Sequence, residues 1–137
     1  MQKFVVREAS MQPVLRPGDR VLAWNRTPSL GDIVVFHASD DSERWFIKRV
    51  VAVSGAMVRI GEITMTVRSR GGHSAVWLLP HREHARTWDL VDNEVFVLSE
   101  DLGATRADSR VYGPLPTVGM FTVFFRYAPL RRLRWRP

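Results

Sequence analysis

The chain has 137 residues, the length of one compact domain, and its lack of cysteine excludes disulfides, thiolate metal sites and a cysteine nucleophile. Its 20 basic against 14 acidic residues give a net charge of +6, which favours an anionic neighbour such as nucleic acid or an acidic membrane surface. No apolar stretch reaches the roughly 18 residues of a membrane span, and the N-terminus lacks the apolar region of a secretory signal peptide.

Short β-branched runs separated by turn-forming residues predict an all-β domain. The expected strands are residues 4–8, 20–24, 32–37, 45–53, 57–60, 63–68, 75–79, 94–98 and 120–126. The step Ile60-Gly61-Glu62-Ile63 predicts a tight hairpin between two of these strands. Residues 69–89 are polar and contain three of the four histidines, which predicts an irregular surface excursion.

A basic tail, residues 130–137, ends the single predicted domain, 1–137, and reads LRRLRWRP. Its arginines alternate with Leu133 and Trp135, a pattern that suits a membrane interface or another polyanion. A disordered, solvated tail is the alternative interpretation.

Three segments carry motifs: 8–22 (EASMQPVLRPGDRVL), 46–54 (FIKRVVAVS) and 95–116 (VFVLSEDLGATRADSRVYGPLP). They contain Ser-Met-x-Pro-x-Leu-x-x-Gly-Asp from Ser10, Lys-Arg-Val from Lys48 and Asp-Ser-Arg from Asp108. In this order the motifs resemble those of type I signal peptidases, membrane-associated serine proteases with a Ser/Lys dyad, including short maturation proteases such as the nickel superoxide dismutase type. The resemblance covers essentially the whole chain and implies a signal-peptidase-like coiled β-sheet with a barrel-like form.

The chemistry of the residues also points to Ser10 as a nucleophile and Lys48 as its base. A serine hydroxyl needs a base that removes its proton, and no histidine of the chain lies in a Gly-x-Ser-x-Gly elbow. The apolar run around Lys48 would desolvate its ammonium and lower its pKa, whereas an arginine would stay protonated. The alternatives are a turn or N-cap serine and a water-facing edge-strand lysine.

The resemblance implies supporting roles for residues of the first and last motifs. Met11 and Pro13 would shape the loop so that the Ser10 N–H faces the developing oxyanion. Asp108 and Arg110 would brace the dyad as an ion pair, and a solvent-exposed turn pair is the alternative.

The last motif also departs from the family pattern. Its usual Gly-Asp-Asn opening reads Ser99-Glu100-Asp101, and the hydroxyl residue that normally contacts the lysine, two positions before the Asp, is Arg106. Thr105 would replace that hydroxyl only with a one-residue shift of the loop. An arginine beside Lys48 would lower the pKa of the lysine by repulsion and would also disturb the geometry.

The motifs together predict a serine endopeptidase that removes signal or leader peptides from a peptide or preprotein with small residues before the cut. The substrate would bind as an added strand between residues 3–8 and 45–48. The expected substrate-binding residues are Val6, Glu8, Leu15, Phe46 and Ile47, and the Glu8 backbone would supply a second oxyanion donor. No cofactor is expected, and no metal either, because His81 and His84 form only a weak metal motif.

Three other functions stay open: a self-cleaving repressor-type Ser/Lys protease, a catalytically degenerate homologue and a basic nucleic-acid-binding β-barrel. Nucleic acid is not the expected partner, because such a barrel has no use for a lone buried lysine paired with the Ser10 motif.

Only nine residues precede Ser10. The resemblance therefore implies either a chain trimmed of its membrane anchor, with an extracytoplasmic active site, or a soluble cytoplasmic or peripheral relative.

Overall fold

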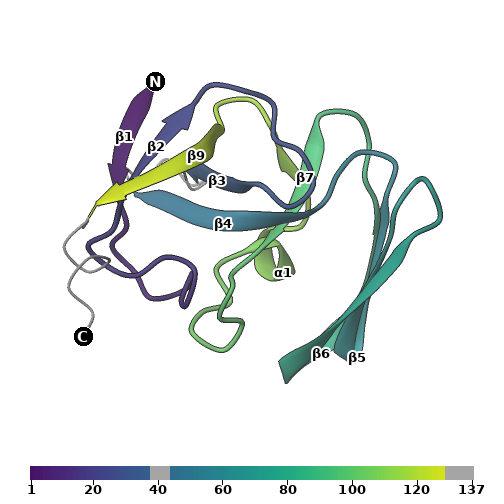
Figure 1. Cartoon of the computed structure of the whole chain (residues 1–137). Coiled ribbons are helices and arrows are strands. Elements are labelled where there is room, and N and C mark those ends of the chain that lie inside the picture. The colour runs from purple at the N-terminus through teal and green to yellow at the C-terminus, as the bar shows by residue number, and fades with distance from the viewer. Residues whose placement is uncertain (38–43, 129–137) are drawn as a thin grey trace.

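The computed structural model describes residues 1–37 and 44–128, and strands make up most of this part of the chain (Figure 1). In chain order the elements are β1 (Gln2–Val5), β2 (Arg20–Trp24), β3 (Ile33–His37), β4 (Trp45–Ala52), β5 (Met57–Arg68), β6 (Ser74–Asp89), β7 (Glu94–Leu98), α1 (Ser109–Tyr112), β8 (Leu115–Pro116) and β9 (Phe121–Ala128). The all-β prediction is confirmed.

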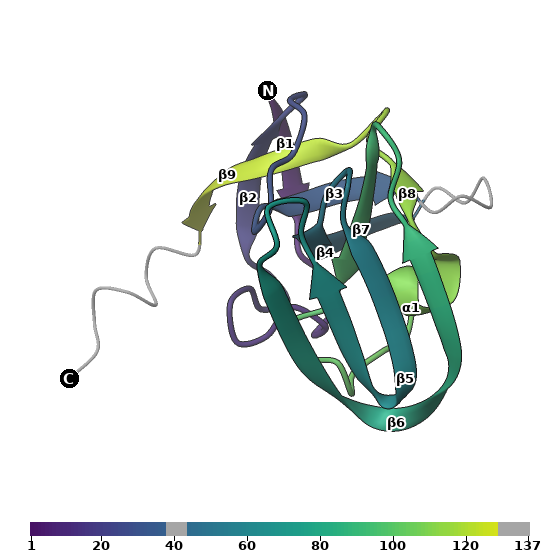
Figure 2. The ribbon, with the colours of Figure 1, turned by 90° about the vertical axis from the view of Figure 1, so that its right-hand side faces the viewer.

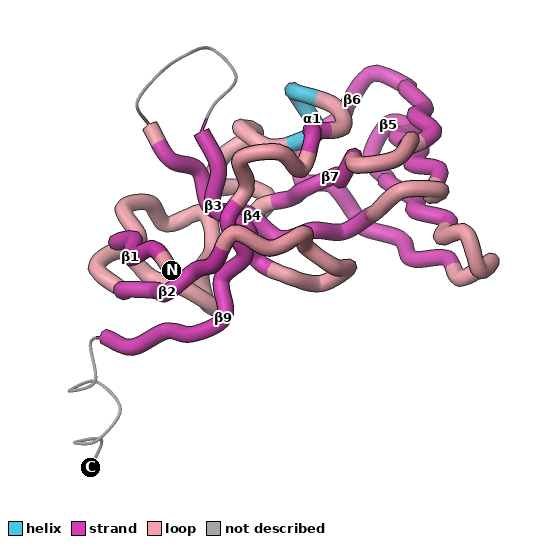
Figure 3. Tube along the Cα trace, turned by 90° about the horizontal axis from the view of Figure 1, so that it is seen from above, coloured by secondary structure: helices cyan, strands magenta, loops and turns pink. Residues whose placement is uncertain are grey.

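Seven of the strands form one antiparallel sheet in the order β1-β2-β9-β3-β4-β7-β8. The other two, β5 and β6, pair with each other as a separate ribbon. Figure 1 and Figure 3 show this ribbon at one end of the molecule and β1 and β2 at the other. In Figure 2 the ribbon faces the viewer, in front of the main sheet.

The predicted strands differ from the observed ones mainly at their ends. The first strand ends at Val5 rather than at residue 8, and Val6 then exchanges backbone hydrogen bonds with the turn before β2: its N–H donates to Asp19 O and its carbonyl accepts from Gly18 N–H. The two-residue β8 and the single-turn α1 were not predicted, because neither is long enough to show a hydrophobic period.

The predicted hairpin between residues 57–60 and 63–68 is wrong, because β5 continues through this step as one strand. Val58 and Ile60 are buried before it, and Met65 and Val67 are buried after it, so the buried side changes from even to odd positions. The pairing register with β6 shifts on both sides of Glu62, which has a positive φ of 54°. A bulge thus returns the second half of the strand to the core face.

The predicted irregular excursion is also wrong in its conformation, because most of residues 69–89 form the 16-residue strand β6. Its side chains are largely exposed, with Leu79 and Glu83 buried and Trp77 and Trp88 packed against a core cluster. A strand that buries so few side chains has a polar composition, which explains why it resembled a loop.

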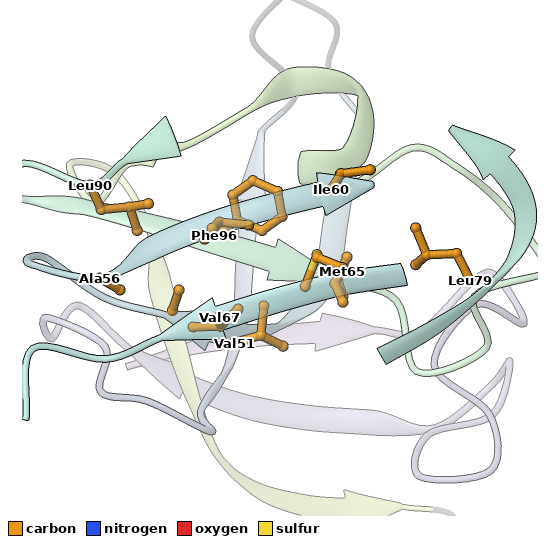
Figure 4. Packing of buried hydrophobic residues seen from close by; sticks show 11 residues of the cluster. Val51, Ala56, Ile60, Met65, Val67, Leu79, Leu90 and Phe96 are labelled. Carbon is orange, nitrogen blue, oxygen red and sulfur yellow. The ribbon is translucent and has the colours of Figure 1, made fainter. Parts of the chain in front are cut away.

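Three buried clusters join these layers. The first fills the space between the ribbon and the main sheet, where side chains of β5, β6 and β7 gather around Phe96 and Met65 (Figure 4). The second consists mainly of side chains from β3, β4 and β7. The third, formed by Val6, Met11, Leu15 and Val21, anchors the segment between β1 and β2.

Within the described ranges, no helix has the length and apolar character needed to cross a membrane.

Candidate active site

Ser10 and Lys48 meet although 38 residues separate them in the chain. Ser10 lies in the turn between β1 and β2, and Lys48 lies on β4. The Lys48 Nζ donates to Ser10 Oγ at 3.2 Å, and the two residues are only 2% and 3% exposed. The structure therefore brings together the two residues expected to act as nucleophile and base.

The turn that carries Ser10 is held by backbone bonds and by the core. Gln12 N–H donates to Ala9 O at 3.0 Å, and Leu15 N–H donates to Met11 O at 2.8 Å. Met11 and Leu15 are buried in the third cluster, and Pro13 is exposed. This packing fixes the turn, so its serine has a defined direction.

Lys48 faces inward because of the two-residue period of β4. Phe46, Lys48 and Val50 are buried, while Ile47 and Arg49 between them are partly exposed. The amine also lies 5.9 Å from the centre of the Phe46 ring. A water-facing edge-strand lysine, the alternative interpretation, is wrong for this residue.

Burial is the main reason why the pKa of Lys48 lies below its ordinary value of 10.5, since the charged ammonium loses its hydration. The carboxylates of Asp108 and Glu8 oppose this effect and raise the pKa, whereas Arg110 and Arg44 add to it by repulsion. The lowered pKa increases the fraction of lysine in the neutral form that can accept a proton.

Asp108 and Arg110 form a fully buried pair beside this amine. The Arg110 side chain donates to Asp108 twice, from Nε at 2.9 Å and from Nη2 at 2.8 Å, and both side chains are 0% exposed. Arg110 also donates to the carbonyls of Leu102 and Thr105 at 3.0 and 2.6 Å, while Asp108 accepts from Ser99 N–H at 3.1 Å. The alternative interpretation, a solvent-exposed turn pair, is therefore wrong. The buried pair binds the loop that precedes it through the carbonyls of Leu102 and Thr105.

Ser99 was not among the predicted site residues, yet its Oγ accepts from Lys48 Nζ at 3.0 Å. Arg106, expected beside Lys48, instead forms an ion pair with Glu83 of β6. Thr105 does not shift toward the lysine, and its hydroxyl accepts from the backbone N–H two residues later at 3.0 Å. The available signal was a hydroxyl residue directly after the apolar run of β7, at a position where the family pattern has glycine.

A cleft of about 520 Å³ lies between β1 and β4, with Ser10 and Lys48 in its lining. The expected substrate-binding residues that line it are Val6, Glu8, Phe46 and Ile47. Leu15, the fifth, does not, because its side chain is 4% exposed and packs under the serine turn. The structure therefore does not bring Leu15 to the cleft with the other four residues.

Glu8 lies at the cleft with its carboxylate held by Arg44 at 2.6 Å. Both side chains are more than half exposed, so this pair contributes little to stability. The contact turns the Glu8 carboxylate toward the guanidinium of Arg44.

In the described part of the chain no three potential ligands gather as a metal site, and His81 and His84 are exposed on β6.

Comparison with known proteins agrees with the motifs and the fold. The family model for signal peptidase, peptidase S26, matches residues 1–125, so the chain belongs to this family of peptidases. The structure is similar to that of a signal peptidase I from Enterococcus faecalis V583, with 18% sequence identity and a TM-score of 0.53. That match covers 73% of this chain and 98% of the other, and it supports the fold. No curated protein matches the chain.

Proposed function

We propose that this chain is a serine endopeptidase that removes N-terminal signal or leader peptides, with Ser10 as nucleophile and Lys48 as general base. The observation that carries the proposal is the buried 3.2 Å contact between Lys48 Nζ and Ser10 Oγ in the lining of a cleft. Membership of the signal peptidase family supports the substrate class.

The reaction needs the neutral form of Lys48. Its Nζ lone pair takes the proton of the Ser10 hydroxyl while Oγ attacks the peptide carbonyl, and the resulting ammonium protonates the leaving amine. The acyl group then remains on Ser10 Oγ. Lys48, neutral again, removes a proton from water, and the water oxygen attacks the acyl carbonyl. The bond from this carbon to Ser10 Oγ then breaks, and the Lys48 ammonium returns the proton to Oγ. These steps use only the two side chains and water.

The substrate would enter as an added strand, because two sheet edges face the cleft without a partner strand. In the described ranges β1 pairs only with β2, and residues 45–48 of β4 pair only with β3. Val6, Phe46 and Ile47 contribute apolar side chains between these edges. Backbone pairing would bind the peptide, and these apolar side chains would favour small residues before the cut.

The proposal extends to an anionic membrane surface as a partner. The net charge of +6 supports it, as does the basic tail, which lies outside the described residues. Cations near such a surface contribute about 1 kcal/mol each. A membrane location would bring the cleft close to leaders that emerge from the bilayer.

The decisive experiment compares the wild type with Ser10→Ala, Lys48→Ala and Lys48→Arg on a peptide with an Ala-x-Ala leader. We expect all three variants to be inactive, because none has both a hydroxyl and a base that can become neutral. The wild-type rate should rise with pH through an apparent pKa below 10.5.

Substantial activity of Lys48→Arg would refute the neutral-lysine mechanism. A profile controlled near pH 6.5 and lost on mutation of one histidine would assign the base to that histidine. A wild type that binds the leader without cutting it would identify a degenerate homologue.

A further inference from the structure

We propose that Ser99 is a positioning residue that orients the amine of Lys48 toward Ser10, a role that rests on the function proposed above. The Lys48 Nζ lies 3.0 Å from Ser99 Oγ and 3.2 Å from Ser10 Oγ. Ser99 itself is 4% exposed and does not line the cleft, so its contact is with the lysine rather than with substrate.

A neutral amine has two N–H groups and one lone pair. For Lys48 to accept the Ser10 proton, its lone pair must face Ser10 and its N–H groups must point elsewhere. Ser99 Oγ accepts one of them, and this hydrogen bond restricts rotation about the Cε–Nζ bond. Without the acceptor, the buried amine could turn its lone pair away from the nucleophile.

The buried ion pair described above holds Ser99 in place. The Ser99 N–H donates to Asp108 Oδ2 at 3.1 Å, and Asp108 is in turn held by two bonds from the side chain of Arg110. Two residues further along, Asp101 N–H donates to the carbonyl of Ser10 at 2.8 Å. One short segment therefore positions both the hydroxyl that binds the lysine and the backbone of the nucleophile.

The other candidates for this role are engaged elsewhere. Arg106 is paired with Glu83, and the hydroxyl of Thr105 is bound to backbone in its own loop. Apart from Ser10, Ser99 is the residue whose hydroxyl contacts Lys48 in the described part of the chain.

The first test measures the pKa of Lys48 directly by ¹³C NMR of the full chain labelled at lysine. Only Lys3 and Lys48 are labelled, and the exposed Lys3 serves as an internal reference. Loss of an acceptor for the ammonium should lower the pKa of Lys48 in Ser99→Ala by about one unit. Ser99→Thr, which keeps the hydroxyl, should retain the wild-type value.

The groups that act on this titration are Asp108 and Arg110 from the last motif, Glu8 from the serine segment and Arg44 before β4. None of them is altered by the substitution. Ser109→Ala is the matched control, because it removes another buried hydroxyl, which accepts from Val97 N–H at 2.9 Å and does not touch Lys48. This variant should lose stability and keep the Lys48 pKa.

The second test measures kcat and KM for a soluble leader peptide at high pH, where Lys48 is neutral in every variant. Loss of orientation should lower the plateau kcat of Ser99→Ala about 10- to 100-fold with KM unchanged, and Ser99→Thr should restore it. Urea unfolding of each variant would show whether it is folded under the assay conditions.

An unchanged plateau kcat in folded Ser99→Ala would overturn the positioning role, and an unchanged Lys48 pKa would overturn the contact on which it rests. A wild type that cleaves no leader peptide would refute the proposed function instead. Even then, the lysine titration decides whether Ser99 holds Lys48.

Discussion

Replacing Lys48 by methionine should remove a pH dependence from the stability of the fold. Methionine has a similar length without the amine, so it keeps most of the packing on the inner face of β4. Because burial lowers the pKa of Lys48 in the folded state, the unfolded chain binds the proton more tightly. The wild type therefore carries an unfavourable contribution below the folded pKa, and this contribution disappears as pH rises toward 10.5.

The magnitude follows from linkage. Between the folded pKa and 10.5 the unfolding free energy of the wild type should rise by about 1.4 kcal/mol per pH unit relative to the variant. Lys48 is 2% exposed, so solvent screening reduces the pKa shift, and with it the pH range of this rise, only a little. The variant also loses the hydrogen bonds to Ser10 and Ser99, about 0.5–1.5 kcal/mol each, and the part of this loss that depends on the charge of Lys48 is already contained in the pKa shift.

The assay is urea unfolding of both proteins from pH 6 to pH 10.5, with Lys3→Met as the matched control. Lys3 is exposed, and its variant should follow the wild-type curve at every pH. The total change in the difference of unfolding free energy between wild type and Lys48→Met should equal the pKa shift that NMR measures multiplied by about 1.4 kcal/mol. Parallel curves for wild type and Lys48→Met would refute the assignment of Lys48 as a lysine with a lowered pKa.

Two further predictions concern the last motif and the tail. Asp108→Asn should lower the unfolding free energy by about 3–5 kcal/mol, because it leaves the fully buried guanidinium of Arg110 without its counter-charge. Asp92→Asn, an exposed control, should change it little, and a loss below about 1 kcal/mol in Asp108→Asn would contradict the role of the pair. Truncation after Pro129 should reduce sedimentation with anionic vesicles while cleavage of soluble peptides is unaffected; equal vesicle binding would make the tail a solvated end.

The sequence by itself determined the all-β class and the residues that carry the candidate chemistry. Short β-branched runs and turn residues are local signals, and they placed β2 and β7 at their observed bounds and β3 and β4 to within one residue. Ser10 and Lys48 were found because their motifs are short and contiguous. The burial of Lys48 was also predictable, since apolar neighbours on a strand indicate a strand that is covered by other elements.

Tertiary structure decided which side each residue faces and which partner it meets. A two-residue period gives alternation along a strand, but one bulge near Glu62 reverses its phase, and only pairing with β6 shows that the strand continues. Leu15 packs in the third cluster and does not line the cleft, a choice of side that the motif alone does not indicate.

The contacts of the last motif needed the assembled fold as well. Ser99 reaches Lys48 across 51 residues of sequence, and Arg106 reaches Glu83 on a strand that looked like a loop. A local pattern contains no information about such partners, because a hydroxyl or a guanidinium binds whichever group the packing of the sheet and the ribbon brings within about 3 Å. The motif therefore identified the chemistry, and the packing determined the geometry that would make it work.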